Sequence, residues 1–320
     1  MTDKRRLGSS GLEVSPLVAG GNVFGWTADE PTSFAVLDAF AAGGVTMIDT
    51  ADCYSSFVPG NVGGESETII GKWMKARGNR DRIQVATKVG IQEIDGKKGI
   101  SRDMIAKGVE LSLKRLQTDY IDLYYAHFDF PDVPQDETAE AFDRLMKAGK
   151  VRAIGASNFA QARLGSALDT AKAAGQAPYS VLQPNFNLMS KELFPPEYRA
   201  FCSEHDIGVL PYYALAAGFL SGKYRTVEEA KKSSRGDSPA KFFNTRGDKV
   251  LATLEQVAKE AGVSQAQIAV AWIIATPGVT APIASATKTA QVESLIAAMN
   301  LKLSDAHMAL LNAAAETPVS

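Results

Sequence analysis

Four residues with ionisable or proton-carrying side chains lie at or just beyond the ends of three successive strand-like runs. They are Asp49, Tyr54, Lys88 and His127. Each run is short and apolar and follows a helical pattern. In a barrel of parallel strands, the strand ends of one sense open on a single face, so residues far apart in sequence meet there. A phenol, an ammonium, a carboxylate and an imidazole brought together at that face would form a site that delivers protons.

Eight apolar runs alternate with helical patterns along the chain, and this rhythm predicts eight parallel strands. The runs show no strict polar alternation, which is typical of strands that helices cover on both faces. Eight such units close into a (β/α)8 TIM barrel of the α/β class. The predicted strands are residues 14–20, 45–49, 83–88, 120–126, 151–155, 181–184, 207–211 and 282–284.

An open, doubly wound sheet is the alternative fold. Such a sheet usually carries a G-x-G-x-x-G turn after its first strand, and this chain contains none. Ahead of the barrel, residues 4–7 and 12–15 flank a Gly/Ser turn and predict a β-hairpin that would plug one barrel end. A polar segment, 221–248, interrupts the alternation, and Ser264 then caps a further helix. No linker or shift in composition appears, so we expect a single domain over residues 1–320.

The composition excludes several classes of protein. Of the 320 residues, 45% are hydrophobic and 22% are charged, and the formal net charge is -2. No run of Lys and Arg is large enough to indicate nucleic-acid binding. No apolar stretch approaches the length of a membrane span, and the N-terminus lacks an apolar leader. We therefore expect a cytoplasmic protein with no nucleic-acid or membrane partner.

The two cysteines and the basic residues of the polar segment carry little functional signal. Cys53 and Cys202 do not form the pairs typical of a disulfide scaffold or a zinc site, and no metal site is predicted. Cys53 is expected to be a small packed side chain beside Tyr54. Lys231, Lys232 and Arg235 lie in the polar segment, where we expect them to be solvated.

Several motifs together resemble the aldo-keto reductase family. The segment Asp-Thr-Ala-Asp-Cys-Tyr, residues 49–54, is similar to the family's aspartate-to-tyrosine segment, and Lys88 and His127 match its other two catalytic positions. The segments 154–159 and 212–224 are also similar, and the resemblance runs almost to the C-terminus. It implies an NAD(P)H-dependent carbonyl reductase on an eight-stranded barrel, with an N-terminal hairpin and extra C-terminal helices.

Carbonyl reduction needs a hydride at carbon and a proton at oxygen. The hydride must come from a cofactor, because no side chain supplies one. Tyr54 is the candidate proton donor, and its ordinary pKa is about 10. An adjacent ammonium, Lys88, is expected to lower that pKa, with Asp49 holding Lys88 charged. His127 is expected to donate a hydrogen bond to the substrate oxygen and orient it.

The resemblance also implies which residues contact the cofactor. The expected contacts of the nicotinamide are Ser157, Asn158, Gln183 and Tyr212, with Tyr212 stacking on the ring. The expected contacts of the pyrophosphate are Leu215, Gly218 and Lys223. The expected contacts of the adenosine phosphate are Ser285, Thr287, Lys288 and Gln291.

The choice between the two nicotinamide cofactors depends on this last group. Ser285, Thr287 and Lys288 precede a predicted helix, whose free backbone N–H groups and dipole favour an anion such as a 2′-phosphate. We therefore expect NADP(H), with NAD(H) as the alternative. Two residues depart from the family pattern, since Thr287 stands where arginine is common and Leu295 where an asparagine that contacts adenine is common.

The substrate is expected to be a small carbonyl or alcohol compound. Trp26, Phe57 and Phe128 lie in loops expected above the barrel mouth, and they predict an aromatic, apolar pocket. Neither the substrate's identity nor an oligomeric state is specified by any sequence feature.

Two other functions stay open. A Schiff-base lyase would use Lys88 as its nucleophile, which leaves the nicotinamide segments unexplained. A regulatory module would sense the nicotinamide redox state, as in the family's channel-associated members.

Overall fold

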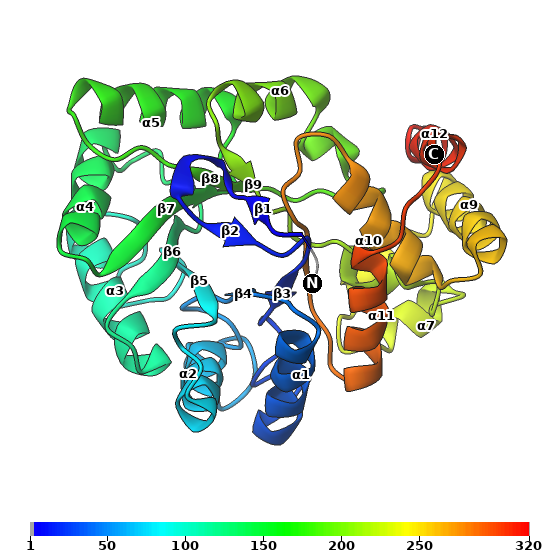
Figure 1. Cartoon of the computed structure of the whole chain (residues 1–320), viewed down its shortest axis with the longest axis horizontal. Helices are drawn as coiled ribbons and strands as arrows, with labels where there is room; N and C mark the ends of the chain where they lie inside the picture. Colours follow the sequence, from blue (N-terminus) through cyan, green and yellow to red (C-terminus); the bar gives the residue numbers. More distant parts are fainter. Residues whose placement is uncertain (1–2, 320) are drawn as a thin grey trace.

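The centre of the molecule is a parallel sheet that curls into a barrel with helices outside it (Figure 1). The computed structural model describes residues 3–319. Residues 1, 2 and 320 of the expected domain over residues 1–320 therefore lie outside the described residues. Within this range the strand order is β10-β3-β4-β5-β6-β7-β8-β9. The strands are β3 (Val18–Gly20), β4 (Met47–Asp49), β5 (Gln84–Val89), β6 (Ile121–Ala126), β7 (Val151–Ser157), β8 (Val181–Gln183), β9 (Gly208–Val209) and β10 (Ile283–Ala284).

Backbone hydrogen bonds join the two ends of this sheet. The N–H of Ile283 donates to the carbonyl oxygen of Pro211 at 2.8 Å, and the N–H of Thr280 donates to that of Val209 at 2.9 Å. β10 also pairs with β3, where Ile283 lies opposite Val18. The (β/α)8 barrel predicted from the alternation of strands and helices is therefore confirmed.

Helices cover the outside of the barrel, and two of them form a separate layer. The helices are α1 (Glu30–Ala42), α2 (Glu65–Arg77), α3 (Arg102–Leu116), α4 (Gln135–Lys147), α5 (Gln161–Ala173), α6 (Pro196–Glu204), α7 (Val227–Lys231), α8 (Asp237–Ala240), α9 (Thr245–Ala261), α10 (Gln265–Ala275), α11 (Thr289–Met299) and α12 (Asp305–Ala315). α12 packs on α9 beyond the ring of barrel helices (Figure 1). Ser264 caps α10 through a reciprocal bond with Gln267, as its position predicts. No helix among residues 3–319 combines the length and apolar composition that crossing a membrane requires.

The N-terminal hairpin closes one end of the barrel. β1 (Arg5–Arg6) pairs antiparallel with β2 (Glu13–Val14), as predicted. Leu7, Leu12 and Val14 are buried in the same cluster as the inward-facing side chains of the strands. The interior of the barrel is therefore a packed core at this end, and the carboxyl ends of the strands lie at the opposite end, where active sites of such barrels form.

Two segments differ from the sequence-based expectation. The run 14–20 is not one strand, because Pro16 separates β2 of the hairpin from β3 of the barrel and has no N–H for a ladder bond. The polar segment 221–248 does interrupt the alternation, but it contains α7 and α8. These helices have only five and four residues, too few to show a periodic pattern. Ala230 and Ala240 anchor them through burial against the rest of the fold.

Candidate active site

The ends of β4, β5 and β6 bring the expected proton-delivery residues together. Asp49 is the last residue of β4 and pairs with Ala86 on β5. Lys88 follows Ala86 by two residues, so its side chain leaves the sheet on the same face as that of Asp49. His127 comes directly after β6, and its backbone N–H donates to Val89. The parallel register alone therefore places the carboxylate and the ammonium in contact.

All three N–H donors of the Lys88 ammonium have acceptors. They donate to Asp49 Oδ1 at 2.7 Å, to the Thr50 carbonyl at 2.7 Å and to the Tyr54 hydroxyl oxygen at 3.0 Å. Lys88 is 0% exposed and Asp49 is 2% exposed. Burial by itself would lower the pKa of Lys88, but the charge of Asp49 and the contact with Tyr54 raise it overall. Lys88 is thus held as a buried cation beneath the phenol.

The pKa of Tyr54 differs from the sequence-based expectation. Burial raises the pKa of the phenol above 10, and the positive charge of Lys88 only partly opposes this effect. The expectation of a lowered pKa was therefore wrong for the free protein, because removal of the phenolate from water outweighs the ammonium. The hydroxyl keeps its proton at neutral pH. Since its oxygen accepts from Lys88, this proton remains available for a different acceptor.

Gln183 lies on the opposite side of the barrel and orients Asp49. Its Nε2 donates to Asp49 Oδ2 at 2.7 Å, while Lys88 occupies the other carboxylate oxygen. Both side chains of the Gln183–Asp49 pair are buried. An amide that sequence reasoning had assigned to the nicotinamide therefore holds the carboxylate that holds Lys88.

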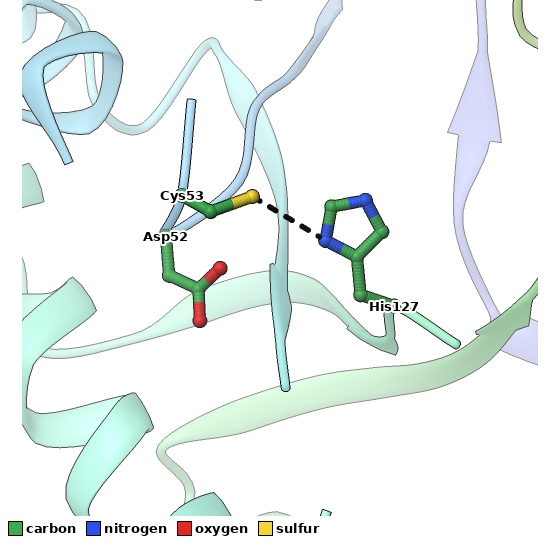
Figure 2. A group of neighbouring side chains, drawn as sticks. All are labelled: Asp52, Cys53 and His127. Carbon is green, nitrogen blue, oxygen red and sulfur yellow. Dashed lines mark hydrogen bonds between the residues drawn. The ribbon is translucent and has the colours of Figure 1, made fainter. Parts of the chain in front are cut away.

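His127 is a neutral imidazole at the edge of this network. Burial, and then the charge of Lys88, lower the pKa of His127 well below its ordinary value of 6.5. Its ring stacks on Phe128 with centroids 5.4 Å apart and meets Tyr54 edge-on at 6.2 Å. The Sγ of Cys53 lies 3.8 Å from its Nδ1, and Asp52 lies next to both (Figure 2). A neutral imidazole can donate a hydrogen bond through only one of its two ring nitrogens.

The expected nicotinamide residues at the ends of β7 and β8 form a hydrogen-bonded group of their own. Ser157 Oγ donates to the Gln183 carbonyl at 3.0 Å, and Asn158 Nδ2 donates to the His127 carbonyl at 3.1 Å. The Tyr212 hydroxyl donates to Asn158 Oδ1 at 2.8 Å. This group fixes the aromatic ring of Tyr212 at the cavity wall.

A cavity of about 320 Å³ extends along this end of the barrel. The expected site residues that line it are Asp49, Tyr54, Tyr212, Leu215, Gly218, Lys223, Ser285, Thr287 and Gln291. Those outside its lining are Lys88, His127, Ser157, Asn158, Gln183, Lys288, Trp26, Phe57 and Phe128. The cavity therefore connects the proton-delivery residues to the segments in which we expected the pyrophosphate and adenosine contacts.

The middle of the cavity has the features of a diphosphate cradle. Gly218 adopts a φ of +92°, a conformation that L side chains rarely take, and a Cβ there would lie 3.0 Å from the Lys223 ammonium. The positive φ favours glycine at this turn, and the absence of a side chain leaves the Lys223 ammonium close to the backbone. A cation beside a bare stretch of backbone suits an anionic group, so the residues present fit a nicotinamide dinucleotide.

Arg235 also lines the cavity and was not predicted. Its guanidinium lies over the Trp26 ring, 4.9 Å from the centroid, and the structure gives it no carboxylate partner among residues 3–319. Burial lowers its pKa from 12.5. The expectation that Arg235 is solvated was therefore wrong, because the chain after α7 folds back over the barrel end. The sequence signal was weak, namely an arginine beside two serines in a polar segment.

The N-terminus of α11 closes the far end of the cavity. Gln291 Oε1 accepts from the Thr287 N–H at 2.8 Å and from its hydroxyl at 3.2 Å, and Ser285 Oγ donates to Asn22 at 2.5 Å. Lys288 precedes the first helical residue and is exposed. The side chains expected at the adenosine phosphate are thus near one another in the chain, and Gln291 of α11 fixes Thr287, which precedes that helix.

The three expected pocket residues lie in loops around the barrel mouth. The Trp26 and Phe57 rings meet edge to face with centroids 5.0 Å apart. Phe57 is 64% exposed and Phe128 is 41% exposed. Large apolar side chains exposed on a loop beside a cavity are typical of a surface that a ligand covers.

Comparison with known proteins agrees with this arrangement. A model of the aldo/keto reductase family matches residues 16–316. This chain belongs to the aldo/keto reductase family. It is 35% identical to the aldo-keto reductase YhdN of Bacillus subtilis (strain 168) over 300 residues, which covers 90% of this chain and 86% of that relative.

Two further relatives in the family carry more specific names. A probable voltage-gated potassium channel subunit beta of Oryza sativa subsp. japonica is 32% identical over 311 residues, which is 93% of this chain and 91% of the relative. An aryl-alcohol dehydrogenase [NADP(+)] of Phanerodontia chrysosporium is 30% identical over 334 residues, covering 94% and 83% of the two chains. Family membership makes this chain an oxidoreductase of the NAD(P)H-using type.

Proposed function

We propose that this chain reduces an aldehyde or ketone to an alcohol, reversibly, with Tyr54 as the general acid. The observation that carries the proposal is the 3.0 Å hydrogen bond from Lys88 to the Tyr54 oxygen at the edge of the cavity. Because that oxygen accepts from Lys88, the phenolic proton is directed to another acceptor. A carbonyl oxygen in the cavity would accept it, and the ammonium would stabilise the phenolate that remains.

Asp49 and Gln183 support this acid without touching the substrate oxygen. Asp49 is the buried counter-ion of Lys88, and Gln183 fixes the second carboxylate oxygen. An ammonium that stays charged and fixed in place stabilises the Tyr54 phenolate, which proton transfer leaves behind, more than it stabilises the neutral phenol. The buried pair therefore stabilises the state that follows proton donation.

His127 orients the carbonyl in this proposal. A neutral imidazole does not compete with Tyr54 as an acid, and its Nε2–H can donate to the same substrate oxygen. Two donors converging on one oxygen would polarise the carbonyl and hold it near the phenol. His127 does not line the cavity, so the substrate must reach its ring from the side of Tyr54 and Phe128.

NADP(H) is the proposed cofactor, and its nicotinamide supplies the hydride when bound. Tyr212 would present its ring to the nicotinamide, while Gly218, Lys223 and Arg235 would hold the pyrophosphate. Thr287 and Lys288 would hold a 2′-phosphate at the N-terminus of α11. The name of the NADP(+)-linked relative supports this preference over NAD(H).

An aromatic aldehyde is the proposed substrate class. Trp26, Phe57 and Phe128 offer rings at the barrel mouth, and one relative is named an aryl-alcohol dehydrogenase. Rings stack or pack edge to face on one another at little cost in conformational entropy.

We also propose a cytoplasmic location, in line with the unpaired state of Cys53 and Cys202.

Of the two alternative functions, the structure disfavours the Schiff-base lyase, and the names of some relatives favour the sensing module. A Schiff-base lyase needs a neutral, accessible amine, whereas Lys88 is buried, fully hydrogen-bonded and has a raised pKa. A nicotinamide-sensing module is favoured by the relatives named as potassium channel subunits. It would bind the same dinucleotide but turn over very slowly, and stopped-flow measurement of hydride transfer separates the two functions.

A panel of aldehydes, ketones and sugars, assayed with NADPH and with NADH, tests the proposal. We expect NADPH oxidation with aromatic aldehydes to exceed that with aliphatic ketones and sugars. Absence of turnover with every carbonyl, together with tight NADPH binding, would instead support the sensing module. Equal rates with NADH and NADPH would refute the cofactor preference.

A further inference from the structure

Cys53 contacts His127, and the reaction outlined above gives Cys53 no role. Its Sγ lies 3.8 Å from His127 Nδ1, within range of a hydrogen bond that involves sulfur (Figure 2). His127 makes no other side-chain hydrogen bond that the structure gives within residues 3–319. We propose that Cys53 is a positioning residue, whose thiol donates to Nδ1 and so keeps the His127 proton on Nε2. This inference rests on the proposed function.

The direction of this hydrogen bond follows from the chemistry of the two groups. Burial, and then the neighbouring Asp52, raise the pKa of Cys53 to about 12, so the thiol keeps its proton. The lowered pKa of His127 leaves its imidazole neutral. An imidazole nitrogen is a good acceptor, whereas sulfur is a weak one. The contact is therefore best satisfied as S–H to Nδ1, which requires N–H at Nε2.

Asp52 is the other group that could receive the thiol proton. One of its carboxylate oxygens lies within 4.8 Å of Cys53 Sγ and of a ring nitrogen of His127. Asp52 is 1% exposed, yet neither of its carboxylate oxygens has a hydrogen-bond partner of sound geometry among the described residues. The thiol therefore has a hydrogen bond of sound geometry with His127 Nδ1, while Asp52, whose charge and hydrogen bond also raise the pKa of Cys53, is the competing acceptor. If the thiol donated to Asp52 instead, Sγ would accept from Nδ1–H, and a bare Nε2 lone pair would face the substrate oxygen.

The consequence for catalysis is specific. A carbonyl oxygen has only lone pairs to offer, so His127 can orient it only with Nε2–H. Without a partner on Nδ1, the ring is free to change tautomer or to turn over about its Cβ–Cγ bond. The contact between Cys53 and His127 thus selects the form of the imidazole that the reaction needs, and the proton itself comes from Tyr54.

The same three side chains are of types that bind metal ions. A metal held by Asp52, Cys53 and His127 would occupy Nδ1 and would need Cys53 as a thiolate. The buried ammonium of Lys88 acts on both Cys53 and His127, and its positive charge opposes a second cation there. A neutral hydrogen-bonded pair is the arrangement that these charges favour.

The test reads the tautomer directly, in the full chain labelled with ¹⁵N-histidine and saturated with NADPH. Two-bond ¹H–¹⁵N correlation spectra distinguish a protonated from a bare Nε2, and a His127→Gln variant assigns the signal. The variants are Cys53→Ala, Cys53→Ser, which keeps a donor, and Cys202→Ala, which removes the distant buried cysteine. Steady-state oxidation of NADPH by the best carbonyl substrate is measured in parallel and gives kcat and KM.

We expect Nε2–H in the wild type and in Cys202→Ala, and a mixture of tautomers in Cys53→Ala. Loss of one weak hydrogen bond should lower kcat of Cys53→Ala by about 3- to 10-fold, with KM for NADPH unchanged, and Cys53→Ser should recover most of both readouts. A bare Nε2 in the wild type would overturn the inference, as would a Cys53→Ala variant with unaltered tautomer and kcat. A thiolate-to-metal absorption band on addition of Co²⁺, absent from Cys53→Ala, would also overturn it. If no carbonyl is reduced at all, the proposed function fails, while the spectra still decide the tautomer.

Discussion

The ammonium of Lys88 donates to the hydroxyl oxygen of Tyr54 at 3.0 Å and to Asp49 at 2.7 Å. A single buried cation thus links a carboxylate at the bottom of the site to the phenol at the cavity wall. Every donor of Lys88 is used, so the phenol oxygen has an acceptor role toward Lys88, and in the proposed reaction its own proton goes to the substrate. This relationship underlies the proposed chemistry and the first prediction.

Replacement of Lys88 by Met should destabilise the protein strongly. The change leaves the Asp49 charge buried without its counter-ion, which typically costs about 3–5 kcal/mol. We expect the double variant Asp49→Asn/Lys88→Met to be more stable than Lys88→Met alone, because it no longer buries an unpaired charge. Urea unfolding of the wild type and of the single and double variants measures both effects. Equal stability of all three proteins would contradict the assigned ion pair.

Asp52 should make stability depend on pH. Burial, and then the nearby Glu67 carboxylate, raise the pKa of Asp52 from 3.8 to about 7. Between these values the native state holds a proton that the unfolded chain has lost, so the free energy of unfolding falls as the pH rises. At 1.36 kcal/mol per pKa unit, the fall from this group is on the order of 4 kcal/mol.

The variant Asp52→Asn tests this dependence. The difference in free energy of unfolding, variant minus wild type, should be larger at about pH 8 than at about pH 5. The reason is that asparagine has no charge to bury at the higher pH. Urea unfolding at the two pH values gives the difference. Asp169→Asn, on the exposed face of α5, is the control and should show no such trend. A pH-independent difference for Asp52→Asn would show that the buried carboxyl does not titrate in this range.

Arg235 should contribute to dinucleotide binding. Its guanidinium lines the cavity, lies over Trp26 and has no carboxylate partner in the described part of the chain. A hydrogen bond to a charged group is worth about 1.5–3 kcal/mol, so Arg235→Ala should weaken NADPH binding by at least about 10-fold. Titration of tryptophan fluorescence measures the dissociation constant. The exposed Arg225, ten residues earlier, is the matched control. An unchanged affinity in Arg235→Ala would remove Arg235 from the cofactor site.

Lys288 should discriminate NADPH from NADH. It precedes α11, where the helix N-terminus favours an anion, but it is exposed, and an exposed ion pair is worth at most about 1 kcal/mol. We expect Lys288→Ala to lower kcat/KM with NADPH by about 5-fold or less and to leave the NADH value unchanged. Steady-state assays with both cofactors provide the measurement, with exposed Lys302→Ala as the control. A parallel loss with both cofactors would place Lys288 outside the 2′-phosphate contact.

The proximity of the expected proton-delivery residues could be predicted from the sequence because the parallel strands themselves position them. Asp49 ends β4, Lys88 is the last residue but one of β5 and His127 follows β6, and strands of one sense expose these ends on one face. The pKa of Tyr54 could not be predicted in the same way. The ammonium is visible in the sequence, but the burial that outweighs it depends on how the chain after β4 packs over the barrel.

The contacts that sequence reasoning missed are those whose partners come from distant segments. Arg235 lies in a segment without periodicity, and only the fold brings it over Trp26. Gln183 was expected to contact the cofactor, and its hydrogen bond across the barrel to Asp49 was not predicted. Cys53 was expected to be merely packed, although this residue of the turn after β4 contacts His127, which follows β6. Composition and spacing carry no record of such contacts, so they emerge only from the three-dimensional structure.

The most direct test of the proposed chemistry is single-turnover hydride transfer in Tyr54→Phe, followed as loss of NADPH absorbance with an aromatic aldehyde. The substitution removes only the hydroxyl that Lys88 and the substrate share, so NADPH should bind with wild-type affinity. Loss of general acid catalysis should slow hydride transfer by about 10²- to 10⁴-fold. Transfer at the wild-type rate in Tyr54→Phe, with the cofactor fully bound, would contradict the assignment of Tyr54 as the proton donor.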